Sequence, residues 1–313
     1  MLPVLMGDVY MSKTKVSQKG LTLKQKEAVT GIAFISLPLI SLILFMYYPI
    51  IRSFYISLFD WNLLTKPTFT GFNNYKTLFH DVVFITALKN TFRWVVTYVP
   101  MSVVTSFLLA LLLDRKLKGA GFFRTLYYVP VVAPIVVVAL LWVWIYNTDY
   151  GILNFVLKAL FGIQPIGWLT DSRYSLFAIA VMSVWKWAGY NMLIFLSALQ
   201  GIDQGIYEAA AIDGVRPMTK LFKIKIPLVM PSIYFVMLTA VIDAFQMFTE
   251  IFIMTKGGPG YSTYTVTYYL WSCAFEYSKM GYACSMAAVM FVIILLVTLI
   301  QNKVMDRKVQ YDA

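Results

Sequence analysis

Acidic and amide side chains recur within one long apolar stretch of the C-terminal half of the chain. Asp243, Gln246, Met247 and Glu250 follow the spacing i, i+3, i+4 and i+7, which places all four on one face of a helix. An ionisable side chain inside a membrane is costly and normally faces a cavity or a partner. The spacing therefore predicts a polar face for a solute path. The alternative is a structural role, in which Asp243 and Glu250 bond to a partner chain or to Lys186.

A second apolar stretch carries its own polar interruption at Gly189, Tyr190, Asn191 and Met192. Paired catalytic groups at bilayer depth would be needed for an intramembrane enzyme, and Asp243 with Glu250 alone is a thin basis for one. We therefore expect both interruptions to line a path rather than to catalyse a reaction.

Motifs for catalysis, nucleotide binding and metal binding are scarce. His80 has no histidine or cysteine at ligand spacing, so we expect no metal site. The chain contains no G-x-x-x-x-G-K-[ST], no G-x-S-x-G and no H-E-x-x-H, so we expect neither a bound nucleotide nor an active site in it. Cys273 and Cys284 could form one disulfide, but two cysteines do not predict a framework of disulfides.

The composition is that of a membrane protein, with 60% hydrophobic and 13% charged residues. Apolar segments of about 20 residues or slightly more can each cross ~30 Å of hydrocarbon. They predict an all-α protein with six transmembrane helices, kinked at the prolines inside them. The predicted spans are 30–51, 90–113, 126–146, 175–199, 226–253 and 282–301.

Basic residues predict the orientation of these spans, because Lys and Arg favour the cytoplasmic side. With both ends inside, the inner segments hold 16 Lys and Arg in 79 residues and the outer segments hold 8 in 94. We therefore predict a cytoplasmic N-terminal tail (1–29) and a cytoplasmic C-terminal tail (302–313). The first residues lack the features of a secretory signal, and either Met1 or Met11 could be the natural start.

The segment 200–225 then lies on the cytoplasmic side, between two spans. Its pattern predicts a short helix at Ile206–Ile212, a turn at Asp213-Gly214 and a second helix at Met218–Ile224. Glycine allows positive φ in such a turn. Small alanines and the carboxylates of Glu208 and Asp213 together favour docking of a soluble partner.

This segment resembles a known signature. Glu208-Ala209-Ala210 and Asp213-Gly214, followed by Phe222, Ile224, Ile226-Pro227 and Pro231, are similar to the E-A-A loop of binding-protein-dependent ABC importer permeases. The runs 71–75 (GFNNY), 185–191 (WKWAGYN) and 255–259 (TKGGP) resemble the carbohydrate branch, which contains the maltose and glycerol-3-phosphate permeases. The resemblance covers about Thr30 to Arg307.

The resemblance implies a type I importer (MetI-like) fold in a bacterial inner membrane and a non-catalytic permease subunit for a sugar, oligosaccharide or polyol phosphate. It implies a second permease, two ATPase subunits that use ATP and Mg, and an external solute-binding protein as partners. Glu208, Ala209, Ala210, Asp213 and Gly214 would couple to the ATPase. Sugar-contacting positions of the maltose relative align with Ala188, Gly189, Met192, Ala240, Asp243, Ala244 and Met247. With the polar interruptions, the expected path residues are Gly189, Tyr190, Asn191, Met192, Asp243, Ala244, Gln246, Met247 and Glu250.

An ion-coupled secondary transporter is the alternative to an ATP-driven permease. Such transporters more often show inverted repeats with broken helices at corresponding positions of two halves, and no such repeat is found in the sequence. The identity of the solute is left open between neutral, acidic and phosphorylated compounds.

Overall fold

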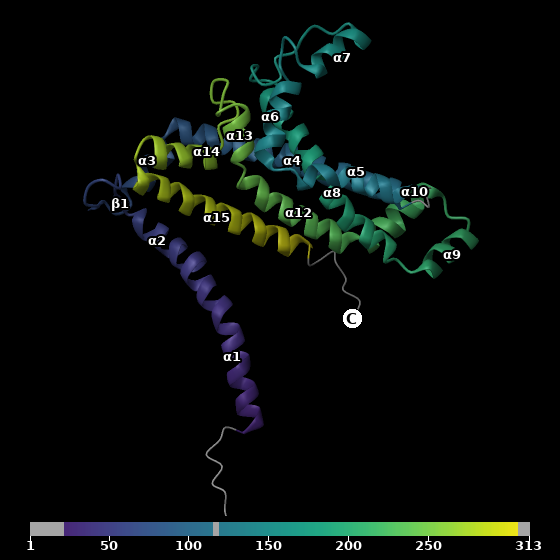
Figure 1. Cartoon of the computed structure of the whole chain (residues 1–313), viewed down its shortest axis with the longest axis horizontal. Helices are drawn as coiled ribbons and strands as arrows, with labels where there is room; N and C mark the ends of the chain where they lie inside the picture. Colours follow the sequence, from purple (N-terminus) through teal and green to yellow (C-terminus); the bar gives the residue numbers. More distant parts are fainter. Residues whose placement is uncertain (1–21, 115–118, 306–313) are drawn as a thin grey trace, which may run out of the picture. The chain divides into compact units, whose positions relative to one another are not determined.

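The computed structural model describes residues 22–114 and 119–305, and the chain divides into two units, Met1–Arg52 and Ser53–Ala313. Figure 1 shows the order of the elements. Most of both predicted tails lies outside the described residues, and so does the choice between Met1 and Met11 as the start.

The first unit is one apolar helical run. It consists of α1 (Leu23–Leu42), the π-helical turn η1 (Ile43–Tyr47) and the start of α2 (Tyr48–Ile56). Thr22 and Gln25 form a capping box at its N-terminus. This run is long and apolar enough to cross a membrane.

The second unit begins with a two-stranded antiparallel hairpin, in which Phe59 pairs with Phe69. Its elements in chain order are β1 (Phe59–Asp60), β2 (Thr68–Phe69), α3 (Asn73–His80), α4 (Val82–Leu113), α5 (Ala120–Val132), α6 (Ile135–Ile145), α7 (Ile152–Phe161), α8 (Ser175–Gln200), α9 (Gln204–Ile212), α10 (Pro217–Lys220), η2 (Leu221–Lys225), α11 (Ile226–Leu228), α12 (Met230–Phe245), α13 (Thr249–Met254), α14 (Val266–Trp271), η3 (Ser272–Glu276) and α15 (Met280–Met305).

Helix α8 is the centre of this unit, packing most extensively on α4 and also on α5 and α12. Two thirds of its most apolar window is buried, against 28% for α4 and for α15. Small residues permit this packing: a Cβ added at Gly189 would lie 2.0 Å from the carbonyl oxygen of Tyr127 in α5. Glycine at helix crossings allows backbones to approach closely in membranes.

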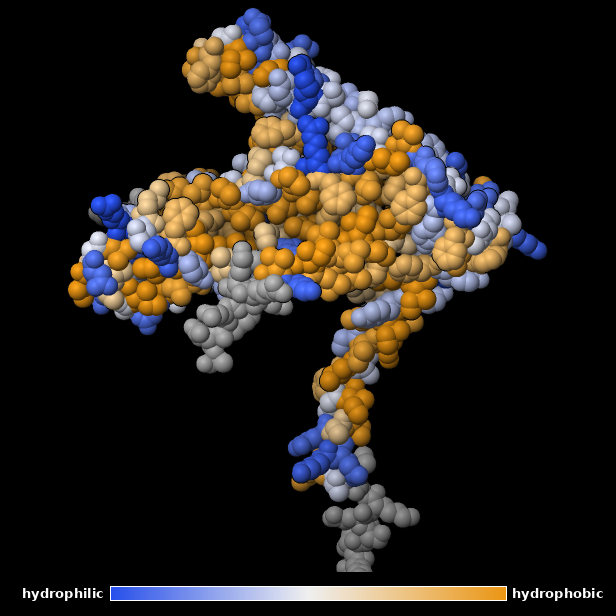
Figure 2. Space-filling model, turned by 180° about the vertical axis from the view of Figure 1, so that it is seen from behind, coloured by the Kyte–Doolittle hydropathy of each residue, from blue (hydrophilic) through white to orange (hydrophobic). Residues whose placement is uncertain are grey.

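Apolar side chains cover large areas of the molecular surface (Figure 2). Phe155, Phe235 and Leu296, for example, are each at least half exposed. A soluble monomer rarely exposes such large apolar areas, whereas helices in contact with lipid do. The described residues contain four helices long and apolar enough to cross a membrane, or six spans if each of two bent helix pairs is one span.

Prolines break two of the predicted spans and leave others intact. The third span is bent by 99° between α5 and α6, next to Pro134. The fifth is bent by 67° between Leu228 and Met230, just before Pro231. In contrast, α1 runs through Pro38, and α4 runs through Pro100.

The prediction of one continuous helix over 226–253 is wrong. Helix α12 ends at Phe245 with Gln246 as its C-cap, and α13 starts afresh at Thr249. Carbonyl groups freed at this break are satisfied from another element: the hydroxyl of Thr267 donates to the carbonyl of Phe245, and that of Thr265 to the carbonyl of Met247. A break inside a span is tolerated when neighbours supply such bonds.

Candidate functional site

A polar cavity lies where α4, α8 and α12 meet the break after Phe245. Its volume is about 480 Å³. Its lining mixes acids, amides, hydroxyls and aromatic rings: Tyr98, Trp187, Tyr190, Asn191, Thr239, Ala240, Asp243, Gln246, Met247, Phe248, Thr249 and Glu250. This lining can exchange hydrogen bonds with a solute that carries many hydroxyl groups, and it can stack on an apolar face of that solute.

The helix break determines how the acidic residues reach the cavity. Asp243 belongs to the last turn of α12, whereas Glu250 lies in the first turn of α13. The single helical face that the spacing predicted does not exist. Asp243, Gln246, Met247 and Glu250 nevertheless share the cavity, because the 246–248 connection turns the chain between the two helices.

Six of the nine predicted path residues line the cavity: Tyr190, Asn191, Asp243, Gln246, Met247 and Glu250. The other three pack elsewhere. Gly189 contacts the backbone of α5, Met192 is fully buried in the core between α4 and α8, and Ala244 is 2% exposed in the main core. These three residues therefore support the walls rather than form them.

Asp243 and Glu250 make no ion pair among the residues that the structure describes. In particular, neither carboxylate forms an ion pair with Lys186. The Lys186 ammonium is buried and donates instead to the carbonyls of Pro130 and Ala133, at 3.1 and 2.7 Å. It thereby caps the C-terminal end of α5 at the 99° break, where a cation is favoured.

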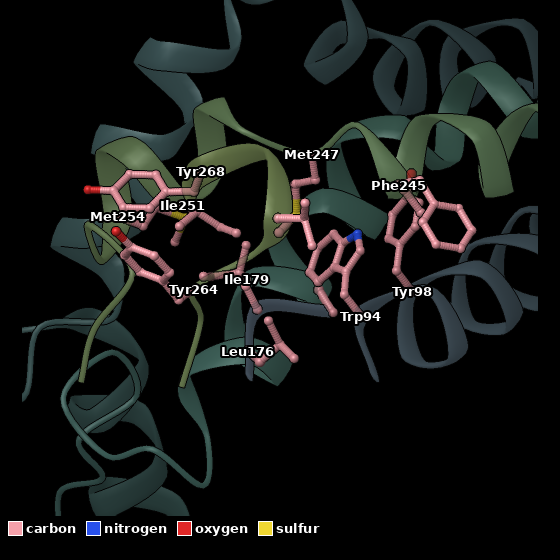
Figure 3. Close-up of a cluster of buried hydrophobic side chains, with 14 of the residues drawn as sticks. Trp94, Tyr98, Leu176, Ile179, Phe245, Met247, Ile251, Met254, Tyr264 and Tyr268 are labelled. Carbon is pink, nitrogen blue, oxygen red and sulfur yellow. The ribbon is translucent and has the colours of Figure 1, made fainter. Parts of the chain in front are cut away.

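Aromatic and amide residues fix the wall formed by α4 and α8. Trp94 and Tyr98 are stacked with ring centroids 5.2 Å apart, and they lie beside Met247 and Phe245 in the core (Figure 3). The amide of Asn191 donates to the hydroxyl of Ser102, at 3.2 Å. This bond joins α4 to α8 beside the cavity.

Sequence reasoning missed five lining residues: Tyr98, Trp187, Thr239, Phe248 and Thr249. Trp187 carried a signal, since it lies in the aromatic run at 185–191. Tyr98 carried none, because it is remote in the chain from Asp243 and nothing in the spacing of α4 distinguishes it.

The segment 200–225 forms a separate surface feature. Helix α9 is N-capped by Asp203, whose carboxylate accepts from the amide of Gly205. It ends in a Schellman motif: the amide of Gly214 donates to the carbonyl of Ala211, and that of Val215 to the carbonyl of Ala210. Gly214 has φ +62° with no atom within 4 Å of an added Cβ. The glycine is therefore required by its backbone conformation and not by crowding.

The exposed face of this segment mixes charge with apolar side chains. Glu208, Ala209 and Asp213 are exposed, whereas Ala210 is buried. Around them Ile212, Met218 and Phe222 are 86%, 68% and 61% exposed. The sequence predicts a smooth surface of three alanines, but Ala210 is buried and does not contribute to it.

One ion pair holds the segment against the end of α4, and a second contact joins α10 to α9 within the segment. Lys225 forms an ion pair with Asp114, at 2.6 Å. The Lys220 ammonium lies 4.3 Å from the centre of the Tyr207 ring. A force applied to α9 and α10 would consequently be passed to α4 and α12.

Comparison with known proteins places this arrangement in context. Residues 102–311 match the model of the binding-protein-dependent transport system inner membrane component. The lactose transport system permease protein LacF of Rhizobium radiobacter is 38% identical over 286 residues, covering 89% of this chain and 94% of its own length. The trehalose/maltose transport system permease protein MalF of Thermococcus litoralis is 32% identical and covers 90% of this chain and 95% of its own length.

The fold also matches a solved structure. One chain in the crystal structure of a bacterial alginate ABC transporter, in complex with an alginate pentasaccharide-bound periplasmic protein, superposes with a TM-score of 0.80 at 22% identity. The match covers 90% of this chain and 96% of that chain. It shows a shared permease fold.

Proposed function

Because the chain belongs to the binding-protein-dependent transport system inner membrane components, a family of multi-pass membrane proteins, we propose that it is a permease subunit of an ATP-driven importer for a sugar or oligosaccharide. The names of its relatives support this solute class, since they refer to lactose and to trehalose and maltose. A polyol phosphate is a second candidate in the same class of polyhydroxyl solutes.

The polar cavity is the observation that carries the proposal. It is lined by two carboxylates, two amides and three exposed or partly exposed aromatic rings, within helices that are otherwise apolar. Hydroxyl groups of a saccharide would replace their water with bonds to Asp243, Gln246 and Asn191, while Trp187 and Tyr190 would stack on the less polar faces of a sugar ring. Asp243 and Gln246 are exposed, so this chain forms one half of the path and a second permease subunit closes it.

The segment 200–225 is the proposed ATPase-coupling element, with Glu208, Ala209, Ala210, Asp213 and Gly214 at its centre. An exposed apolar row beside two carboxylates suits a cleft on a soluble subunit, and the ion pair between Lys225 and Asp114 would transmit its movement to α4. ATP hydrolysis belongs to two separate subunits in this account, and an external solute-binding protein delivers the sugar. This chain itself is non-catalytic.

The proposed topology has six spans with both termini in the cytoplasm. Each bent helix pair counts as one span, so α5 with α6 becomes the third span and α11 with α12 belongs to the fifth. The Lys and Arg bias toward 1–29, 114–125, 200–225 and 302–313 supports this orientation.

Uptake by the reconstituted complex tests the proposal. Proteoliposomes containing this permease, its partner permease and the ATPase subunits would receive loaded binding protein outside and ATP inside. We expect saccharide uptake that requires internal ATP, is blocked by vanadate and continues with a protonophore. Uptake that proceeds without ATP and stops with the protonophore would establish ion coupling instead.

A further inference from the structure

A second cavity of about 720 Å³ lies between the coupling segment and the ends of α4 and α8. It is remote from the polar cavity in the chain's fold and shares no lining residue with it. The elements that enclose it are the end of α4, the 199–207 region and the 217–225 segment: its walls are Leu111, Asp114, Leu199, Gln200, Ile202, Gln204, Tyr207, Pro217, Met218, Lys220, Leu221 and Lys225.

Cations dominate the charge of this cavity. Lys225 is neutralised by Asp114, at 2.6 Å. Lys220 takes part in neither of the two ion pairs within the described residues, and its ammonium lies over the Tyr207 ring. The segment 215–225 also contains Arg216 and Lys223 and no acidic residue. An anion that entered the cavity would therefore meet an uncompensated positive charge.

A hydrogen-bond donor without a partner lies in the same place. The Tyr207 hydroxyl oxygen is buried and has no hydrogen-bond partner. Its ring lies 4.3 Å from the Lys220 ammonium and 5.5 Å from the Lys225 ammonium. Burial, and secondarily the Asp114 carboxylate, raise the pKa of Tyr207, so the hydroxyl remains a donor at neutral pH. A buried donor without a partner is costly, and a phosphate oxygen would satisfy it.

The remaining walls are apolar. Six of the twelve lining residues are aliphatic or thioether side chains or proline: Leu111, Leu199, Ile202, Pro217, Met218 and Leu221. A soluble inorganic anion gains nothing from such walls. A phospholipid does, because its glycerol and first acyl carbons are apolar while its phosphate is charged. The proposed topology puts this cavity at the cytoplasmic membrane surface, where anionic lipids attract basic pockets between helices.

We propose that this cavity binds the headgroup of an anionic phospholipid, with the phosphate beside Lys220 and the Tyr207 hydroxyl, and that the lipid links the coupling segment to α4 and α8. The membrane side of the site rests on the proposed function, whereas the cavity and its charges do not. The lipid would stiffen the joint through which α9 moves the transmembrane helices.

Native mass spectrometry of the delipidated, purified transporter complex tests the site directly. Phosphatidylglycerol and phosphatidylcholine would be titrated separately, and binding would be compared between the wild type and Lys220→Gln. We expect the wild type to prefer phosphatidylglycerol and Lys220→Gln to lose about fivefold in affinity for it, since each Lys near an anionic surface contributes about 1 kcal/mol. Tyr207→Phe should weaken the same binding by a smaller factor.

Lys223→Gln is the matched control, because Lys223 carries the same charge in the same segment but does not line the cavity. If Lys220→Gln and Lys223→Gln lose equal affinity for phosphatidylglycerol, the lipid is attracted by the general surface charge, and the proposed site is overturned. Equal binding of both lipids by the wild type would also overturn it. Displacement of the lipid by inorganic phosphate would assign the cavity to a soluble anion instead and overturn the lipid site. None of these readouts depends on transport, so a failed site and a failed transport function remain distinguishable.

Discussion

The polar cavity and the coupling segment are built in opposite ways. The coupling segment is local: its cap, turn and exposed side chains all lie within residues 203–225, and a Schellman motif at Gly214 sets its shape. The cavity collects residues from α4, α8, α12 and α13, and it depends on a broken helix whose carbonyls are satisfied by Thr265 and Thr267. The coupling segment should tolerate substitutions far from it, whereas the cavity depends on packing between helices that are distant in the chain. Substitutions in the two regions should consequently fail in different ways.

Gly214→Val should have the largest effect on coupling. Valine at φ +62° costs of order 1–3 kcal/mol of backbone strain and displaces α10 relative to α9. We expect most of the ATPase subunit to be lost when the membrane complex is purified, and hydrolysis stimulated by the loaded binding protein to fall with it.

Gly201→Val is the control for that change. Gly201 also follows a helix, but it has φ −79° and an added Cβ would make ordinary contacts at 3.5 Å. It should retain the ATPase subunit. Normal retention and normal stimulated hydrolysis in Gly214→Val would remove the assignment of this segment to coupling.

Asp243→Ala and Gln246→Ala should have a smaller effect, confined to the solute path. Both residues are exposed in the cavity, and neither side chain makes a hydrogen bond or ion pair within the described part of the chain. Removing a group that bonds the solute costs about 0.5–1.5 kcal/mol, or 1.5–3 kcal/mol for a charged group. We expect the apparent affinity for saccharide uptake to fall by about three- to a hundredfold at unchanged assembly, as measured by uptake assays and co-purification.

Ala substitution of Thr239, which lines the same cavity but bonds to the carbonyl of Phe235 in its own helix, is the matched control and should change uptake less. If Asp243→Ala and Gln246→Ala both transport normally, this face belongs to the structure and not to the path.

Glu208→Ala should have the smallest effect. The change removes one exposed carboxylate and leaves the Schellman motif and the buried Ala210 untouched. Because the carboxylate is exposed and screened by salt, loss of its bond to the ATPase subunit should cost only about 0.2–1 kcal/mol of docking affinity. We expect partial loss of the ATPase subunit at high salt and a folded, correctly inserted permease. Retention equal to that of wild type across a salt titration would exclude Glu208 from the interface.

The same contrast explains what the sequence could predict. The turn at Gly214 and the exposed carboxylates of the coupling segment follow from neighbouring residues, and apolar length predicts most helices. The end of α12 at Phe245 could not be predicted, because no proline or glycine marks it and its carbonyls are satisfied by threonines some 20 residues later in the chain. Lys186 was likewise considered a partner for carboxylates, whereas its ammonium caps a helix end that exists only because the third span is bent.

Gly189 is a second residue whose role could not be predicted from the sequence. Its position inside a polar interruption indicated the solute path, yet a Cβ there would meet the Tyr127 carbonyl. Spacing alone does not tell a glycine that lines a cavity from one that lets two helices approach. Which neighbour it faces depends on the packing of α5 on α8, and that information is spread over both helices.

The ratio of saccharide imported to ATP hydrolysed tests most directly whether the two regions perform separate tasks. It would be measured in the same proteoliposomes for wild type, Asp243→Ala and Gly214→Val at one limiting saccharide concentration. We predict that Asp243→Ala lowers the ratio while hydrolysis stimulated by the loaded binding protein persists, and that Gly214→Val lowers hydrolysis and uptake together. Equal ratios in wild type and Asp243→Ala, or persistent hydrolysis with a lowered ratio in Gly214→Val, would contradict the division between a solute path and a coupling element.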